Sequence, residues 1–277
     1  AMGGAESESP MQKWGKWLGV AVGAIVFAIA LYSLRREFAT YNVRQVRSAV
    51  RFLHPIFIVR GALFAIAAYA ALIVYDVLAL RYIKSALPVR RTAFISFIAF
   101  AFSNALGFPL LLGGGLRYRL YNAAGLSSAD IALTIAFSTV TFWLGVLSVA
   151  GGTLLFAPSG PAAVFGIPLS IVQPIGVLLL LVVAAYLLLC AYYRRPIRIV
   201  GWEFLPPTGR VALAQVVISA VDWLLVAAVL WSVIPLPPEH LTFSLVVGAF
   251  VLAQVAGLVS HVPGGLGVFE FTFVALL

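Results

Sequence analysis

Residues 56–82 read IFIVRGALFAIAAYAALIVYDVLALRY, an apolar run that contains Arg60, Asp76 and Arg81. A run of this length matches the roughly 20 residues with which an α-helix crosses the hydrocarbon core of a bilayer. It lacks the alternation of apolar and polar residues that marks a half-buried strand. The stretch therefore predicts a membrane-spanning helix with an aspartate inside the membrane, whereas the two arginines near its ends reach toward the interface.

The composition of the whole chain extends this prediction. Of its 277 residues, 63% are hydrophobic and 10% are charged, and the mean hydropathy is +1.08. In soluble domains about a quarter of the residues are charged, far more than in this chain, so its apolar surplus must face lipid. Lipid requires every backbone polar group to be paired within the protein, which leaves helices or a closed barrel. The apolar runs show no period of two, which excludes the barrel.

We therefore expect an all-α polytopic membrane protein of about seven or eight helices, with two re-entrant segments broken by glycine and proline. Residues 1–13 are interpreted as a tag remnant with a disordered N-terminus, and 14–277 as a membrane domain that continues beyond Leu277. A capping-box sequence at 127–130 is expected to start one helix, which ends near 156. The other helices are expected at about 17–34, 56–82, 92–106, 171–193, 211–234 and 241–259, with an interfacial helix at 35–51 and a last helix cut short by the chain end.

The net charge of +9 is explained by topology, because Lys and Arg collect in cytoplasmic loops; attraction to anionic headgroups is a compatible second role. The loop at 157–170 has no charge and suits the outside. If the helix at 92–106 and the helix that ends near 156 both crossed the membrane fully, this uncharged loop would lie on the same side as the basic loop at 81–91. The conflict disappears if the helix at 92–106 and residues 108–120 form a hairpin that enters and leaves from the cytoplasm. The basic residues that place two loops in the cytoplasm are Arg81, Lys84, Arg90 and Arg91 in one, and Arg194, Arg195, Arg198 and Arg210 in the other.

Two parts of the chain look alike, and this likeness predicts an inverted repeat. Asp76 and Asp222 each lie inside an apolar helix, and each is followed by a short helix and a glycine-rich break. Inverted repeats with broken helices are typical of alternating-access transporters, whose substrate sites lie near the midplane. Chance is the alternative, since glycine is common in membrane helices. The break residues are Gly113, Gly114 and Gly115 in the first copy, and Pro263, Gly264 and Gly265 in the second.

Charges inside the apolar segments indicate the functional site, because each costs about 2.5–3.5 kcal/mol at a helix centre. Arginine binds phosphate oxygens through a bidentate fork, and carboxylates suit a cationic group. Both signs together favour a zwitterionic or aminoacylated lipid headgroup. The alternatives are a structural ion pair of Asp76 with Arg117, and a loop histidine that merely bonds backbone at 261. The predicted substrate-binding residues are Asp76, Arg117, Arg119, Asp222, His261 and Glu270.

Motifs of hydrolases and of nucleotide-driven transporters do not occur in the sequence. The single cysteine, Cys190, lies in an apolar run, which rules out a disulfide framework. We expect no catalytic residues, no metal and no cofactor in this chain, and no nucleic-acid partner. The expected partners are the membrane and its anionic and aminoacylated phospholipids; homo-oligomers stay open.

The segment His261-Val-Pro-Gly-Gly-Leu-Gly-Val-Phe-Glu270, together with Tyr75-Asp76 and Gly113-Gly-Gly-Leu-Arg-Tyr-Arg119, resembles the membrane domain of the bacterial multiple peptide resistance factors. These are bifunctional lysyl-phosphatidylglycerol flippases and synthetases. The resemblance implies a cytoplasmic-membrane protein that flips lysyl-phosphatidylglycerol to the outer leaflet and so confers resistance to cationic antimicrobial peptides. It also implies that Asp76 and Arg117 act in flipping, and that a synthetase domain beyond Leu277 transfers lysine from its tRNA to phosphatidylglycerol.

Two other functions remain open from the sequence. The region can serve as a membrane scaffold that delivers lipid to a synthetase, or as a related lipid transporter without a synthetase. Translocation by the isolated membrane region separates the first of these from a flippase.

Overall fold

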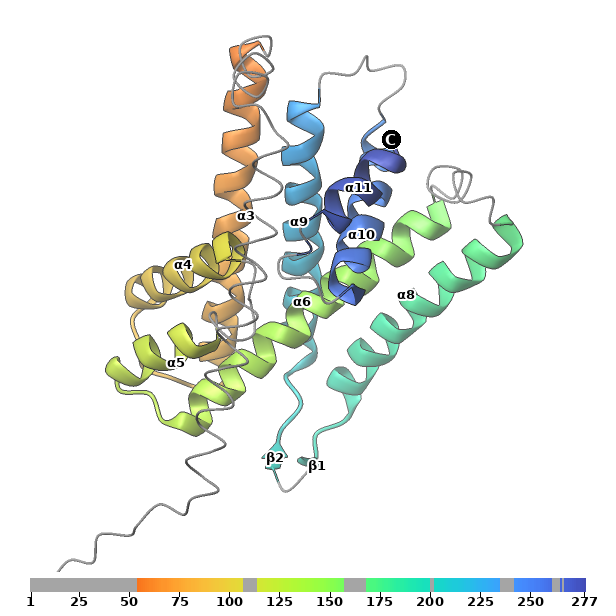
Figure 1. Cartoon of the computed structure of the whole chain (residues 1–277). Helices are drawn as coiled ribbons and strands as arrows, with labels where there is room; N and C mark the ends of the chain where they lie inside the picture. The colour runs from red at the N-terminus through yellow and green to blue at the C-terminus, as the bar shows by residue number, and fades with distance from the viewer. Residues whose placement is uncertain are drawn as a thin grey trace, which may run out of the picture.

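The computed structural model describes residues 54–106, 114–156, 168–199, 202–234, 242–260, 265 and 267–277. The helices expected at 17–34 and 35–51 and the N-terminal remnant lie outside the described residues. Within them, the chain forms eight helices and one short hairpin (Figure 1). The elements are α3 (Pro55–Tyr82), α4 (Val89–Leu106), α5 (Gly114–Ala123), α6 (Ser128–Phe156), α8 (Leu169–Tyr192), β1 (Ile197–Ile199), β2 (Trp202–Phe204), α9 (Gly209–Val233), α10 (Phe243–Val259) and α11 (Val268–Ala275).

Four of these helices, α3, α6, α8 and α9, are long and apolar enough to cross a membrane. Their ends follow local signals: Pro55 occupies the first turn of α3, where a missing N–H costs nothing, and Thr208 caps α9 through Val211 N–H. Many large apolar side chains on these helices are exposed, as a lipid-facing surface requires. The helical membrane fold expected from the sequence is confirmed.

Helices α3 and α9 lie side by side and run in opposite directions (Figure 1). Near the start of α3, a Cβ built on Gly61 would lie 3.3 Å from Val233 Cγ1, at the end of α9. Further along α3, Tyr75 bonds to Asp222 in the middle of α9. This antiparallel pairing agrees with the opposite directions expected for the two copies, while the repeat itself stays a prediction.

Helix α6 crosses the molecule obliquely and packs on α3, α8 and α9 (Figure 1). Glycines allow the close approach. A Cβ on Gly145 would lie 2.9 Å from the Ser219 carbonyl of α9, and one on Gly151 would lie 3.0 Å from the Gly176 carbonyl of α8. Small residues are the usual contact points of membrane helices, because backbones can then pack closely.

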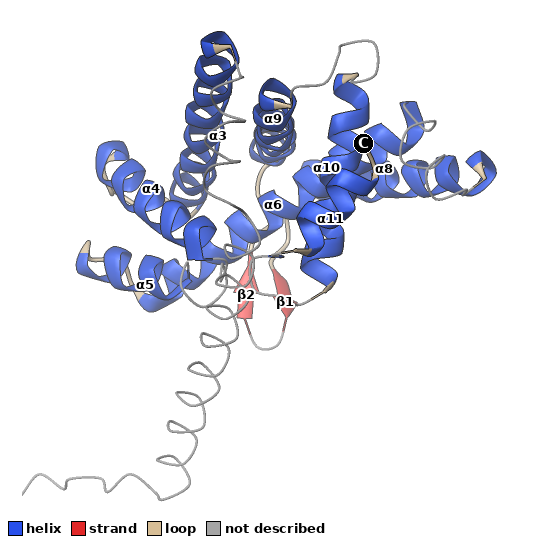
Figure 2. Cartoon of the chain, turned by 45° about the horizontal axis from the view of Figure 1, so that its top comes forward, coloured by secondary structure: helices blue, strands red, loops and turns tan. Residues whose placement is uncertain are grey.

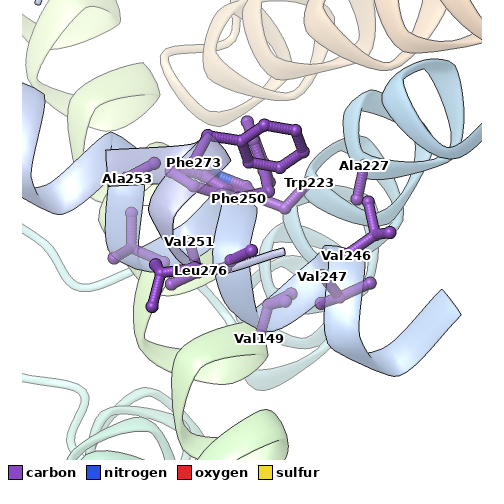
Figure 3. Packing of buried hydrophobic residues seen from close by; sticks show 12 residues of the cluster. Val149, Trp223, Ala227, Val246, Val247, Phe250, Val251, Ala253, Phe273 and Leu276 are labelled. Atoms are coloured by element: carbon purple, nitrogen blue, oxygen red, sulfur yellow. The ribbon is translucent and has the colours of Figure 1, made fainter. Parts of the chain in front are cut away.

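An apolar core fills the space among α6, α9, α10 and α11. In Figure 3, Trp223 and Phe250 lie at its centre, with Phe273 from α11 beside them. The ring centroids of Trp223 and Phe250 are 5.3 Å apart. A second cluster joins α3, α4, α5 and α6 through Leu80, Ile95, Tyr121 and Ile131. On α6, the buried polar residues Ser138 and Thr141 lie between Ile131 of the second cluster and Val146 of the first.

Helices α4 and α5 pack against each other and are not among the four long apolar helices. This agrees with the expected hairpin, although its connection at 107–113 lies outside the described residues. The structure differs from the expectation in one respect: Gly114 and Gly115 begin α5, where an unwound break was expected. Contacts outside the helix account for this, since Arg117 and Tyr121, one turn apart, both bond to Asp76.

The two basic loops lie at the same end of the molecule. Strands β1 and β2 form an antiparallel hairpin between α8 and α9, drawn in red in Figure 2. The Tyr82 hydroxyl at the end of α3 donates a hydrogen bond to the carbonyl of Leu205, just after β2. The bond joins the α3–α4 connection to the hairpin region, as expected if both loops face the cytoplasm.

Candidate functional site

Asp76 of α3 is completely buried and accepts four side-chain hydrogen bonds. Ser96 Oγ and the Tyr121 hydroxyl donate to Oδ2 at 2.6 and 2.9 Å. Arg117 Nη2 and Ser138 Oγ donate to Oδ1 at 3.1 and 2.9 Å. These five residues, which we call the Asp76 cluster, come from α3, α4, α5 and α6. They join the short helices to the membrane-spanning ones.

The ion pair of Asp76 with Arg117 is neutral as a unit, which lowers the cost of burying either charge. A buried pair is tolerated only when its remaining donors and acceptors are satisfied. Asp76 meets this condition through its three neutral donors. Arg117 meets it less completely: its Nε is buried and has no hydrogen-bond partner among the described residues. Its Cζ lies 4.1 Å from the ring centroid of Phe100, a cation–π contact.

A second buried carboxylate, Asp222 of α9, lies across the α3–α9 interface. The Tyr75 hydroxyl donates to its Oδ2 at 2.9 Å, while Oδ1 is buried without a partner among the described residues. The Tyr75 ring meets Phe100 edge to face at a centroid distance of 6.4 Å. Phe100 therefore lies between Tyr75 and Arg117, and it connects the surroundings of Asp222 to the Asp76 cluster.

A chain of polar side chains, half-buried at Tyr186 and buried at Gln215 and Thr141, links α8, α9 and α6. The Tyr186 hydroxyl donates to Gln215 Oε1 at 2.6 Å, and Gln215 Nε2 donates to Thr141 Oγ1 at 2.8 Å. Thr141 lies three residues after Ser138 of the Asp76 cluster, on the same face of α6. The bonds satisfy polar groups that would otherwise be costly in a lipid-embedded bundle.

The structure places Arg119 and Glu270 apart from this network. Arg119 is exposed on α5, and Glu270 is exposed at the start of α11, where its carboxylate accepts the Gly267 N–H at 2.7 Å. Gly265 has a φ of +65° and packs against Gly257. Of the break residues, Gly114 and Gly115 are helical. The positions that lie outside the described residues are Gly113, His261, Pro263 and Gly264.

Three members of the Asp76 cluster were missed by the sequence reasoning: Ser96, Tyr121 and Ser138. Two signals were present. Tyr121 follows Arg117 by four residues, so a helix places both on one face. On α6, small and polar residues recur at helical spacing and mark the face turned toward α3 and α9. Those residues are Thr134, Ser138, Thr141, Gly145 and Ser148.

The described part of the site combines a buried carboxylate, a guanidinium and three neutral hydroxyl donors. In the described part of the chain, no group of three His, Cys, Asp or Glu side chains is placed to hold a metal ion. The cluster provides a buried carboxylate with four donors, next to a guanidinium whose Nε has no hydrogen-bond partner in the described part of the chain. A guanidinium with a free donor can bind an anionic oxygen, and the carboxylate can bind a cationic group.

No protein-family model matches the chain. It is similar to the inner membrane protein YbhN of Escherichia coli, with 34% identity over 211 residues that cover 73% of this chain and 63% of that protein. It is also similar to the phosphatidylglycerol lysyltransferase of Staphylococcus haemolyticus, with 24% identity over 255 residues. This match covers 89% of the chain but only 28% of the lysyltransferase. The chain thus corresponds to a minor part of the lysyltransferase and to a larger part of YbhN.

Four membrane-length helices and the similarity to YbhN identify a multi-pass protein of the bacterial inner membrane. The uncharacterized protein slr0712 of Synechocystis is 35% identical over 266 residues, which cover 96% of this chain and 82% of slr0712. At this identity and coverage, the chain belongs to the same family as slr0712.

Proposed function

We propose that this protein moves a phospholipid of the phosphatidylglycerol class, including its lysyl form, from the inner to the outer leaflet of the membrane. The observation that carries the proposal is the buried pair of Asp76 and Arg117, in which Arg117 Nε has no hydrogen-bond partner among the residues that the structure describes. A headgroup phosphate can bind this guanidinium as a bidentate acceptor.

Arg117 can leave Asp76 at a low cost in free energy, because the carboxylate has hydrogen-bond donors besides the guanidinium. Asp76 would keep its bonds from Ser96, Tyr121 and Ser138. An ammonium group on the same headgroup can then take the place of the guanidinium at Oδ1. A lipid that carries both a phosphate and an amine therefore supplies a counter-charge to Arg117 and to Asp76. A lipid with a phosphate alone leaves the negative charge of Asp76 without a counter-charge. This exchange favours aminoacylated lipid over plain phosphatidylglycerol.

The similarities support the lipid class. One relative is a phosphatidylglycerol lysyltransferase, of which the chain covers 28%. The match to slr0712 covers 82% of that protein, so this membrane region also occurs without most of the additional length of the lysyltransferase. We therefore assign translocation to this chain and leave lysine transfer to a separate synthetase domain or protein. Lysyl lipid in the outer leaflet would lower the attraction of the surface for cationic peptides.

Translocation can be tested with purified protein in liposomes that contain fluorescent phosphatidylglycerol or fluorescent lysyl-phosphatidylglycerol. Quenching by an impermeant reductant reports how much labelled lipid reaches the outer leaflet over time. We expect the wild type to accelerate exchange, the lysyl lipid to move faster, and R117Q to abolish the acceleration. R119Q is the matched control, because Arg119 is exposed on the same helix. Exchange no faster than in protein-free liposomes would contradict the proposal.

A scaffold that binds lipid without moving it is the second candidate. The observation that favours it is that Asp76 accepts four hydrogen bonds from within the protein. Such bonds can serve to hold α3, α4, α5 and α6 together. The same liposomes distinguish the two: a scaffold would retain labelled lipid through purification, with Arg117-dependent binding, and would leave the exchange rate at its protein-free value.

A further inference from the structure

Asp222 is a buried acid without a basic partner among the described residues. Asp222 is 5% exposed, and among the described residues its carboxylate accepts a hydrogen bond from the Tyr75 hydroxyl. The first aspartate, Asp76, has Arg117 for charge balance; the second has a single neutral hydroxyl. An isolated ionised carboxylate in an apolar interior is strongly unfavourable even after the protein relaxes. The surroundings of Asp222 therefore require that its charge be neutralised by something that binds there.

Among the described residues, none of the basic side chains on α9 or on the elements packed against it forms an ion pair with Asp222. Helix α10 contains no titratable residue, and on α6 the one acidic residue, Asp130, lies in the first turn and bonds to Ser127. Arg60 of α3 lies over the ring of Trp231, near the far end of α9. The remaining charged or titratable residues on α3, α8 and α9 are Tyr69, Tyr75, Asp76, Arg81, Tyr82, Tyr186, Cys190, Tyr192 and Arg210.

The geometry points to a proton-binding site at the Asp222 carboxyl, with proton uptake and release controlling the Arg117–Asp76 pair. A proton fits the site better than a metal ion does. Hard cations require six or more oxygen ligands, whereas Asp222 is joined to one hydroxyl and is followed by Trp223, which belongs to the apolar core. A proton on Oδ1 removes the charge and needs no further ligand.

The link to the lipid site is a continuous set of contacts. When Asp222 is ionised, its Oδ2 holds the Tyr75 hydroxyl at 2.9 Å. When it takes up a proton, the charge that strengthens this bond is lost. The Tyr75 ring rests edge-on against Phe100, and Phe100 carries the Arg117 guanidinium on its face. Tyr75 and Asp76 are also adjacent in sequence, so a shift of α3 against α9 moves both.

The proton site itself stands without the proposed lipid function; its control of Arg117 rests on that function. The experiment therefore has two parts. In the first, infrared difference spectra of the protein in lipid are recorded between acidic and alkaline pH, and the C=O absorption of a protonated carboxylic acid is followed. We expect D222N to lose one such band and Y75F to shift it. D130N is the matched control, since it removes a carboxylate outside the core.

Failure of D222N to remove a band would overturn the proton site, whatever the lipid assay shows. A band that follows sodium concentration at fixed pH would overturn it as well, in favour of a metal cation. In the second part, lipid exchange is measured across the same pH range. We expect a pH-dependent rate in the wild type and in D130N, and loss of that dependence in D222N. A pH-dependent rate in D222N would overturn the control of Arg117, while a positive infrared result without any exchange would retain the proton site and remove the proposed function.

Discussion

Arg117 and Asp76 are separated by 41 residues in sequence and form an ion pair of 3.1 Å within the membrane-embedded bundle. The two partners differ in how they are supported. Asp76 has three neutral donors besides Arg117, whereas Arg117 rests on Phe100 and its Nε finds no hydrogen-bond partner in the described segments. The carboxylate is thus the fixed member of the pair, and the guanidinium is the member that can exchange partners.

This asymmetry predicts unequal costs for removing each partner. D76N leaves a buried guanidinium without an anion, and removing one partner of a buried pair costs about 3–5 kcal/mol. R117Q leaves a carboxylate that keeps three donors, so we expect a smaller loss. The melting temperature can be followed with a thiol-reactive dye, because Cys190 is the only cysteine and is buried.

The double variant D76N/R117Q provides the control for this comparison. Because it removes both charges, we expect it to be more stable than the sum of the two single losses implies. Strict additivity, or a larger loss in R117Q than in D76N, would show that the cluster does not fix the carboxylate as described.

Much of the fold could be predicted from the sequence because it follows from local signals. Apolar length gives the four spanning helices, and α9 at Gly209–Val233 differs from the expected range by two residues or fewer at each end. The Thr208 cap and Pro55 account for two of the boundaries. Short-range rules therefore suffice for these helices.

The site was predicted only in part, because its contacts connect distant residues. Asp76 and Arg117 were found through their cost inside a membrane. Ser96 and Ser138 bond to Asp76 across 20 and 62 residues, and neutral hydroxyls carry no comparable penalty to mark them. Glu270 was expected in the site by analogy between the two repeats, but the structure shows its carboxylate bonded to Gly267 at a helix start.

The contact between α6 and α8 predicts a large difference between neighbouring glycines. A Cβ at Gly151 would lie 2.9 Å from Leu180 Cγ, and one at Gly176 would lie 2.9 Å from the Gly151 carbonyl. We expect G151A and G176A each to cost about 1–3 kcal/mol by overpacking. Gly152 is the control, because a Cβ there has nothing within 4 Å. Equal melting temperatures for G151A and G152A would contradict this packing.

The antiparallel pairing of α3 and α9 predicts a specific disulfide. A Cβ on Gly61 would lie 3.9 Å from the Ser232 Cβ, within the range of about 3.5–4.5 Å found in disulfides. In a C190S background, G61C/S232C should cross-link on mild oxidation in membranes. The control pair is G61C/L224C, whose second residue lies about 12 Å further along the helix and should not react. Cross-linking of the control alone would reject the pairing.

The position of the basic loops predicts which ends of the helices are reached from outside the cell. The bond from Tyr82 to Leu205 holds the α3–α4 connection and the hairpin region at one end, and Lys and Arg favour the cytoplasm. In a C190S background, an impermeant maleimide should label H54C in intact cells but should reach K84C and R195C only after permeabilisation. All three residues are exposed, so burial does not explain a difference. Labelling of K84C and R195C from opposite sides would show that the two loops do not share a membrane face, and labelling of both in intact cells would invert the orientation, placing the Arg117 end of the bundle at the outer leaflet.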